Sequence, residues 1–210
     1  MSVQKIPPTI RGYLFNEVSS AFQKSIRRGW EEDSLYWAAE LDRSGYGEYV
    51  WKRIRIITSE DIGLAEPYLP ATIRALYENW VQEKKKKDER LFPERMYMVH
   101  AILLLVRAKK SRICDHSKMW AWSDHIPYKE IPDVALDKHT YAGKKMGRGF
   151  EHFFDEGMYL ENADPNLPDV YQEKARAVRT GQLGEPVNPP RPRASLQAEG
   201  VLDEDTLELG

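Results

Sequence analysis

Residues 49–67 have the sequence YVWKRIRIITSEDIGLAEP, in which a basic and apolar run leads into two carboxylates, a glycine and a proline. Val50, Ile54 and Ile57 recur at intervals of four and three residues, which is the spacing of one face of an α-helix. The segment therefore predicts a helix that buries this face and carries its basic residues on the other sides.

The residues after this run predict a sharp corner between two helices. Gly63 can adopt the positive φ of a helix C-cap, and Pro67 can open the next helix at its first position. The structural corner predicted in this way consists of Ser59, Glu60, Asp61, Gly63 and Pro67.

Glu60 and Asp61 need a compensating partner, because negative charge at a helix C-terminus opposes the helix dipole. Lys24, Arg27 and Arg28 on the preceding predicted helix are candidates. A charge-assisted pair of this kind would hold two helices in one relative position. The sequence favours a structural ion pair, and a catalytic acid pair is the alternative.

Helical spacing of apolar residues continues on both sides of the corner, and glycines and prolines separate the segments that have it. The sequence contains no internal repeat and no long alternating run typical of a β-strand. The predicted fold class is therefore all-α, with further helices over residues 15–28, 33–43, 69–87, 93–109, 111–120 and 169–180.

The helix that contains the run HAILLLV is apolar on nearly every side, which predicts that it is the central helix of the bundle. Met96, Val99, Leu103 and Val106 form one stripe at helical spacing. His100 lies on the same helix, and a lone histidine there is interpreted as a core residue with satisfied hydrogen bonds.

The chain divides by composition into a helical part and a loop-rich part. Residues 1–14 are predicted to be an irregular lead-in, and residues 15–125 to be a helical domain. Prolines and glycines become frequent afterwards, so residues 126–180 are expected to be a loop-rich extension that packs on the helical domain through its aromatic side chains. Residues 181–210 are predicted to be a disordered tail.

Composition limits the possible classes of protein. The formal net charge is −2, from 33 acidic and 31 basic side chains, so any contact with nucleic acid requires a local basic patch. Cys114 is the single cysteine, which excludes an internal disulfide. The sequence shows no membrane span and no secretion signal at its amino terminus, so we expect a cytoplasmic protein.

The short motifs of common enzymes are missing. A P-loop requires the pattern GxxxxGK[ST], but Gly143 and Lys144 are followed by Lys145, and the upstream glycine is absent. The patterns GxSxG, HExxH and CxxC are also absent. We therefore expect no intrinsic ATPase activity and no cofactor, and whether the chain is an enzyme of another kind stays open.

Basic residues suggest where an anion or DNA could bind. Three glycines and several cations between residues 138 and 149 suit a loop that binds phosphate through backbone amides and side chains; the alternative is an ordinary surface loop. With the basic sides of two helices, the candidate DNA-binding or anion-binding residues are Lys24, Arg27, Lys52, Arg55, Lys138, His139, Lys144, Lys145 and Arg148.

A second hypothesis is a metal-dependent enzyme acting on nucleic acid or nucleotide through residues 137–156. Asp137, His139, Glu151 and His152 are its candidate ligands or acid-base groups. Their spacing does not match the close pairs of ligands that identify metal sites, so no metal site is assigned.

Several segments resemble one family, the carboxy-terminal region of the RarA/MgsA group of clamp-loader-like AAA+ ATPases. Residues 53–67, RIRIITSEDIGLAEP, are similar to the family pattern RLxRxASEDIGLADP. Residues 21–27, AFQKSIR, resemble ALQKSIR, residues 35–38, LYWA, resemble part of ALYWLA, and residues 108–111, AKKS, resemble APKS. These matches cover about residues 15–122 in the same order.

The resemblance implies an all-helical bundle like the clamp-loader collar, which oligomerises and is attached to an ATPase that acts at stalled replication forks. It is a resemblance to this region without the ATPase domain, and residues 146–152 match the family run GYGxGYxYxH only loosely. We therefore expect a non-catalytic assembly module that forms a homo-oligomer and binds DNA or a replication or repair protein. Whether it works with an AAA+ ATPase supplied in trans stays open.

Overall fold

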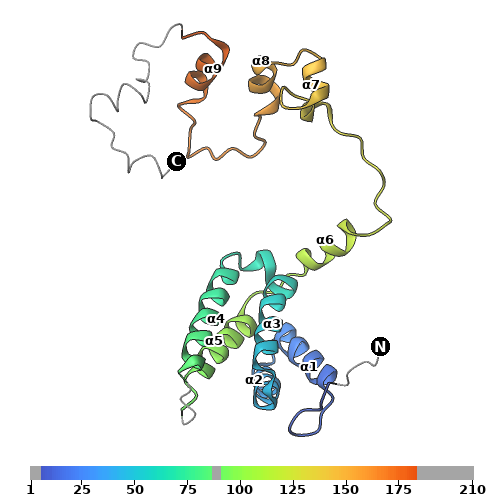
Figure 1. The fold of residues 1–210 in the computed structure, drawn as a ribbon, viewed down its shortest axis with the longest axis vertical. Coiled ribbons are helices and arrows are strands. Elements are labelled where there is room, and N and C mark those ends of the chain that lie inside the picture. Colours follow the sequence, from blue (N-terminus) through green and yellow to red (C-terminus); the bar gives the residue numbers. More distant parts are fainter. Residues whose placement is uncertain (1–5, 87–90, 184–210) are drawn as a thin grey trace, which may run out of the picture. The chain divides into compact units, whose positions relative to one another are not determined.

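The computed structural model describes residues 6–86 and 91–183, and the fold of these residues is all-α without strands, as predicted (Figure 1). The chain divides into two compact units, unit 1 (Met1–Pro127) and unit 2 (Tyr128–Gly210). The packing of residues 126–180 on the helical domain stays a prediction. Of the predicted tail over residues 181–210, the part after residue 183 lies outside the described residues.

Unit 1 is a bundle of helices linked by tight turns. The chain kinks at Asp42–Tyr46, where Gly45 has a left-handed φ of 85°. Thr58–Ile62 is a π-helical turn, and Gly63–Ala65 is a 3₁₀ turn. The helices are α1 (Phe15–Arg28), α2 (Glu31–Leu41), α3 (Gly47–Ile57), α4 (Leu69–Lys85), α5 (Glu94–Arg107) and α6 (Ile113–Ala121).

Local sequence signals explain where several of these helices end. Gly29 ends α1 with a left-handed φ of 75°, a conformation that costs glycine little. The helix α2 begins at Glu31, two residues before the predicted start at residue 33. Trp30 occupies its N-cap position, and Ser34 lies inside the helix, where its hydroxyl donates to the Trp30 carbonyl oxygen at 2.6 Å.

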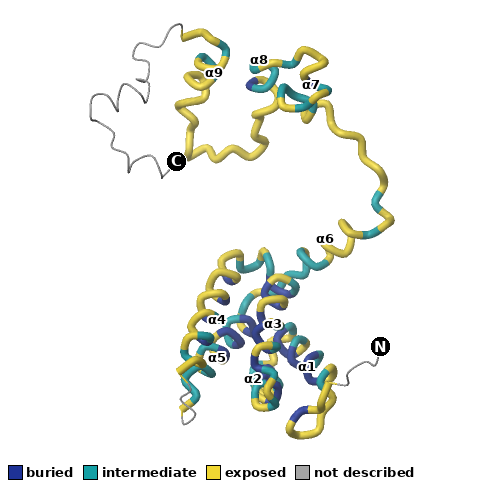
Figure 2. The backbone as a smooth tube through the Cα atoms, viewed as in Figure 1, coloured by how far each residue is buried: buried dark blue, intermediate teal, exposed yellow. Residues whose placement is uncertain are grey.

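The core of unit 1 lies where α5 meets the four preceding helices, each of which it contacts. Figure 2 shows this interior as the buried part of the tube. Trp51 on α3 and Trp80 on α4 meet there with ring centroids 5.9 Å apart. Burial of side chains of this size supplies most of the free energy that holds the bundle together.

The central position predicted for α5 is correct. Its buried residues are Met98, Ala101, Ile102, Leu105 and Val106. Of the stripe seen in the sequence, Val106 is buried, whereas Met96 is 72% exposed and Val99 is also exposed. The prediction that His100 is a core residue is wrong, because its side chain is exposed. Periodicity cannot identify the inner face of a helix that is apolar on every side.

The lead-in before α1 is fixed to unit 1 by hydrogen bonds. The amide of Ile10 bonds Ser44 Oγ at 3.0 Å, and the Tyr46 hydroxyl bonds the Pro7 carbonyl oxygen at 2.9 Å. Arg11 pairs with Glu40, which is fully buried, at 3.0 Å. Burial alone would raise the pKa of Glu40, but hydrogen bonds from Thr9 and Arg11, with the charge of Arg11, lower it below its ordinary value.

Unit 2 has little core of its own. In the part of unit 2 that the structure describes, Phe154 is the one buried hydrophobic side chain. Its elements are a 3₁₀ turn at Asp133–Ala135, α7 (Tyr141–Lys145), α8 (Phe150–His152), a π-helical turn at Phe153–Gly157, and α9 (Gln172–Thr180).

Candidate functional site: an ionic corner and a basic groove

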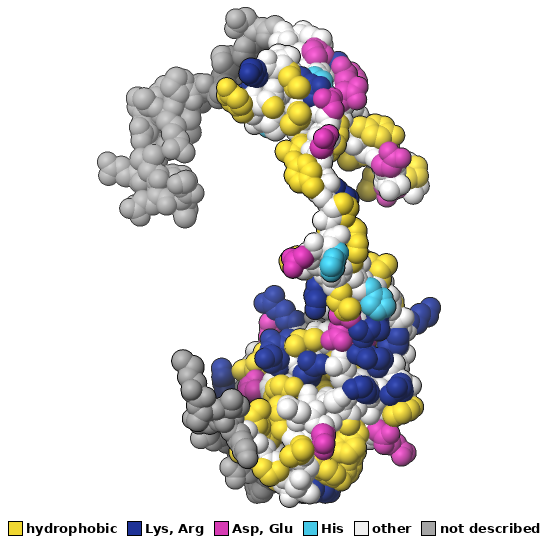
Figure 3. Space-filling model, turned by 90° about the vertical axis from the view of Figure 1, so that its right-hand side faces the viewer, with side chains coloured by type: hydrophobic (Ala, Val, Ile, Leu, Met, Phe, Trp, Pro, Cys, Tyr) yellow, Lys and Arg dark blue, Asp and Glu magenta, His cyan; other side chains and the backbone are white. Residues whose placement is uncertain are grey.

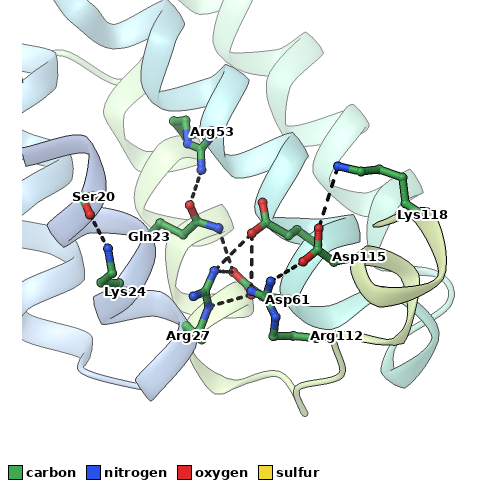
Figure 4. Close-up of polar contacts among 10 residues, drawn as sticks. Ser20, Gln23, Lys24, Arg27, Arg53, Asp61, Arg112, Asp115 and Lys118 are labelled. Carbon is green, nitrogen blue, oxygen red and sulfur yellow. Dashed lines mark hydrogen bonds and ion pairs between the residues drawn. The ribbon is translucent and has the colours of Figure 1, made fainter. Parts of the chain in front are cut away.

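The corner after α3 is built around a buried carboxylate. The helix continues as the π-helical turn Thr58–Ile62, which places Asp61 inside the unit with none of its side chain exposed. Asp61 accepts hydrogen bonds from Arg27 Nε at 2.7 Å, Arg112 Nη1 at 2.8 Å and Gln23 Nε2 at 3.2 Å (Figure 4). A buried carboxylate is stable only with such partners.

Glu60 shares the same two arginines, although its side chain is 25% exposed. Arg27 Nη2 lies 3.2 Å and Arg112 Nη1 lies 3.4 Å from Glu60 Oε1. The backbone closes the corner, because the Ser111 amide donates to the Asp61 carbonyl oxygen at 2.9 Å. This network connects α1, the π-helical turn and the start of α6, and we call it the ionic corner. It consists of Gln23, Arg27, Glu60, Asp61, Arg112 and Asp115.

Of the three cations considered as partners from the sequence, Arg27 makes the pair. Lys24 instead contacts Ser20, and Arg28 lies over the Trp30 ring with its guanidinium carbon 5.1 Å from the centroid. Arg112 is the partner that sequence reasoning missed, because it lies 51 residues after Asp61. In the sequence, Arg112 is marked only by its position directly after the segment AKKS, which resembles the family.

The environment of Arg112 stabilises its charge. Burial lowers the pKa of the guanidinium, but Asp115, Asp61 and Glu60 together outweigh this effect and raise it. Arg112 therefore stays protonated, and it joins carboxylates from two parts of the chain.

Gly63 and Pro67 differ in how far they match the predicted corner. Gly63 has the expected positive φ, 49°, and a Cβ atom there would lie 2.8 Å from Cys114 Sγ. The close approach of α6 therefore depends on glycine. The prediction for Pro67 is wrong: α4 begins at Leu69, and Pro70 is the proline of its first turn.

An open groove with a volume of about 550 Å³ lies beside the ionic corner. Residues spaced by three and four along α3 and its π-helical turn form one wall, and the first turns of α6 form the other. Figure 3 shows Lys and Arg side chains gathered on the upper part of unit 1. We call the groove between α3 and α6 the basic groove. Its lining residues are Lys52, Arg55, Ile56, Ser59, Glu60, Cys114, Asp115 and Lys118.

The structure separates the nine candidate DNA-binding residues into two sets. Lys24, Arg27, Lys52 and Arg55 lie in unit 1, where two of them line the basic groove. The other five, from residues 138 to 148, lie in unit 2. The two sets are therefore separate candidate surfaces.

In the glycine-rich segment of unit 2, Gly143 lies in a packed helix, whereas Gly147 and Gly149 lie after α7 with open space around them. Gly143 is buried inside α7, where a Cβ atom would lie 1.9 Å from the Asp137 carbonyl oxygen. Thr140 caps the helix by accepting from the Gly143 amide at 3.0 Å. Gly143 thus serves close packing, and its amide is used by Thr140; anion binding by the rest of the segment stays a prediction.

The cations of unit 2 have mixed surroundings. Arg148 is held by Asp133, at 2.7 Å from both carboxylate oxygens, and by the Leu136 carbonyl oxygen at 2.8 Å. Lys138 lies over the Phe150 ring, with Nζ 3.9 Å from the centroid. Lys144 and Lys145 are exposed in the last turn of α7.

The geometry of residues 137–156 does not assemble the set of the second hypothesis. His139 Nδ1 lies 2.9 Å from Asp137 Oδ2, and hydrogen bonds from the His139 ring and amide lower the pKa of Asp137. Glu151 is held by Arg176. Within residues 6–86 and 91–183, no three His, Cys, Asp or Glu side chains come together as metal ligands would.

These features define a class, an all-helical domain in which a buried carboxylate and two arginines hold three elements together. Comparison with known proteins then gives the relatives. The chain is 32% identical over 165 residues to replication-associated recombination protein A of Bacillus subtilis (strain 168), a match that covers 75% of this chain and 37% of the relative. The resemblance to the RarA/MgsA group is confirmed.

Two further relatives carry the same name. The protein of Escherichia coli (strain K12) is 29% identical over 148 residues, and that of Haemophilus influenzae is 28% identical over 147 residues. Each match covers 68% of this chain and 31% of the relative. The chain thus spans about a third of the length of these curated relatives. No family model matches it.

No helix in the described part of the chain is long and apolar enough to cross a membrane.

Proposed function

We propose that this chain is a non-catalytic helical assembly module that works in replication-associated recombination. In this role it self-associates, binds DNA or a replication or repair protein, and works together with an AAA+ ATPase. The name shared by the relatives supports a role in replication-associated recombination. The exposed apolar side chains of unit 1 support self-association.

The observation that carries self-association is the second apolar face of α5. Only one side of this helix is covered within unit 1, while Met96, Val99 and Leu103 lie on the other side. Tyr68, just before α4, is 85% exposed next to this face. Exposed apolar surface of this kind marks sites of protein contact.

A groove on the same face gives the contact its shape. It is an open groove of about 580 Å³ between α4 and α5, and its apolar lining includes Leu69, Leu103 and Leu104. Glu66, His100 and Arg107 also line it. An apolar centre with polar groups around it is the usual anatomy of a protein interface.

A second copy of the chain is the occupant that we propose for this face. Most homo-oligomers close by two-fold symmetry, which would place the outward side of α5 against the same side of its partner. A stable interface of this kind buries roughly 800 Å² on each partner.

Light scattering at micromolar concentration tests the proposal. The unmodified chain should have the mass of a dimer or a larger assembly, and Val99→Glu should shift it to the monomer, because the carboxylate would be buried without a partner. Val178→Glu is the matched control, since Val178 is an exposed valine on α9. A monomeric unmodified chain would refute self-association.

A further inference from the structure

The basic groove carries an excess of positive charge, although the whole chain has a formal net charge of −2. Both carboxylates in its walls already have partners: Glu60 pairs with Arg27 and Arg112, and Asp115 pairs with Arg112 and, at 3.9 Å, with Lys118. Asp61 shares the two arginines, so three carboxylates face three cations in this network and their charges balance. The excess in the groove comes from Lys52 and Arg55.

The cations on the α3 side of the groove have no such partners. Among the residues that the structure describes, neither Lys52 nor Arg55 lies within 4.0 Å of a carboxylate oxygen. Arg55 is positioned by an aromatic ring, because its guanidinium carbon lies 4.8 Å from the centroid of Tyr77. Both side chains are exposed. The surplus charge thus faces solvent, where a polyanion can reach it.

An exposed indole continues the α6 wall beyond the groove. Asp115, Lys118 and Trp122 are spaced by three and four residues, so they lie along one side of α6 and its C-cap. Trp122 is 83% exposed. A large flat aromatic surface in water, beside a groove whose other wall carries the unpaired cations Lys52 and Arg55, is the combination that binds unstacked bases.

We propose that the basic groove binds single-stranded nucleic acid, with Lys52, Arg55 and Lys118 on the phosphates and Trp122 stacked on a base. The proposal deepens the DNA-binding part of the proposed function and is independent of self-association. It predicts binding that tolerates changes of base sequence, since every base offers a π-face to the indole.

The combination of residues favours a single strand over other polyanions. In a duplex the bases are stacked inside the helix, so Trp122 would have no base to stack on. An acidic peptide would engage the three cations and gain no stacking from the indole. Trp122 is therefore the residue that separates these occupants.

Fluorescence anisotropy with the full chain and a labelled deoxythymidine oligonucleotide of about 15 nucleotides, within the range of known single-strand sites, tests the proposal. Trp122→Ala should weaken binding roughly 10-fold, and Trp122→Phe should restore most of the affinity because a ring is kept. Lys52→Glu should lower the slope of log affinity against log salt by about 0.7 for each phosphate that the protein no longer neutralises.

Trp30→Ala is the matched control, because Trp30 is also an exposed tryptophan beside a cation, Arg28. It should leave the affinity unchanged. Equal losses for the two tryptophan variants, or tighter binding of a duplex of the same length, would overturn the proposal. The proposal would also be overturned if the chain bound an acidic polyglutamate peptide instead of the oligonucleotide and Trp122→Ala did not change the affinity for that peptide.

Circular dichroism and thermal unfolding of each variant complete the test. Trp122→Ala should leave the melting temperature unchanged; a lower melting temperature would show that Trp122 is covered within the protein and would also overturn the proposal. Oligonucleotide binding that ignores Trp122 rejects this inference and leaves DNA binding standing. A chain that binds no nucleic acid rejects both, while light scattering still decides self-association separately.

Discussion

At the scale of single residues, Asp61 has the largest predicted effect on stability. It is fully buried and bound by two arginines, whose side chains are 33% and 30% exposed. In Asp61→Asn the charge that both arginines face inside the corner is lost. Removing one partner of a buried ion pair costs roughly 3–5 kcal/mol, and the partial exposure of the arginines puts the expected loss near the lower value. Urea unfolding measures it.

Glu60→Gln is the control for this substitution. Glu60 has the same two partners at longer distances, and its side chain is partly exposed, so the loss should be at most about 1 kcal/mol. Equal losses for the two variants would show that the ionic corner behaves as an ordinary surface network.

Glu40 makes a prediction about acid. Its pKa in the folded protein lies below its ordinary value of 4.5. The carboxylate therefore stabilises the fold fully above pH 4.5, and this contribution is lost as the pH falls below 4.5 through the folded pKa. Glu40→Gln should be less stable at neutral pH and should lose less further stability on acidification. Thermal unfolding from pH 7 to pH 3 tests this, and parallel pH profiles for the two proteins would contradict it.

At the scale of elements, the sequence was informative where one face of a helix differs from the rest. The ends of α1 and the buried positions of α4 could be predicted, since a glycine and a clear apolar stripe mark them. The inner face of α5 could not, because apolar residues surround it. Arg112 could not be assigned to Asp61 either, since only the fold brings the start of α6 to the end of α3.

The junction of these two elements makes a prediction of its own. Gly63→Ala would place Cβ in contact with Cys114 Sγ and also strain a positive φ, with an expected loss of roughly 1–3 kcal/mol in urea unfolding. Gly12→Ala carries the φ strain alone, because nothing lies within 4 Å of its Cβ position. Adding Cys114→Ala should recover part of the loss at Gly63. No recovery would mean that the contact with α6 is not the cause.

At the scale of the whole molecule, the two units differ in how they can be stable. Unit 1 has a continuous apolar core made by α1 to α5, whereas Phe154 is the single buried hydrophobic side chain in the described part of unit 2. A domain needs its own core to fold alone. Unit 1 should therefore be an independent folding unit, whereas unit 2 should not fold alone.

Limited proteolysis tests this difference. Tyr128, at the start of unit 2, is 90% exposed in a segment without helix, and exposed chain of this kind is cut first. Chymotrypsin should cleave near Tyr128 and leave a fragment of unit 1 that keeps its helical circular dichroism and cooperative thermal unfolding. Self-association of this fragment should persist, because the outward face of α5 remains in it. If the fragment unfolds once unit 2 is removed, the extension is part of the fold, and the predicted packing of residues 126–180 on the helical domain gains its first support.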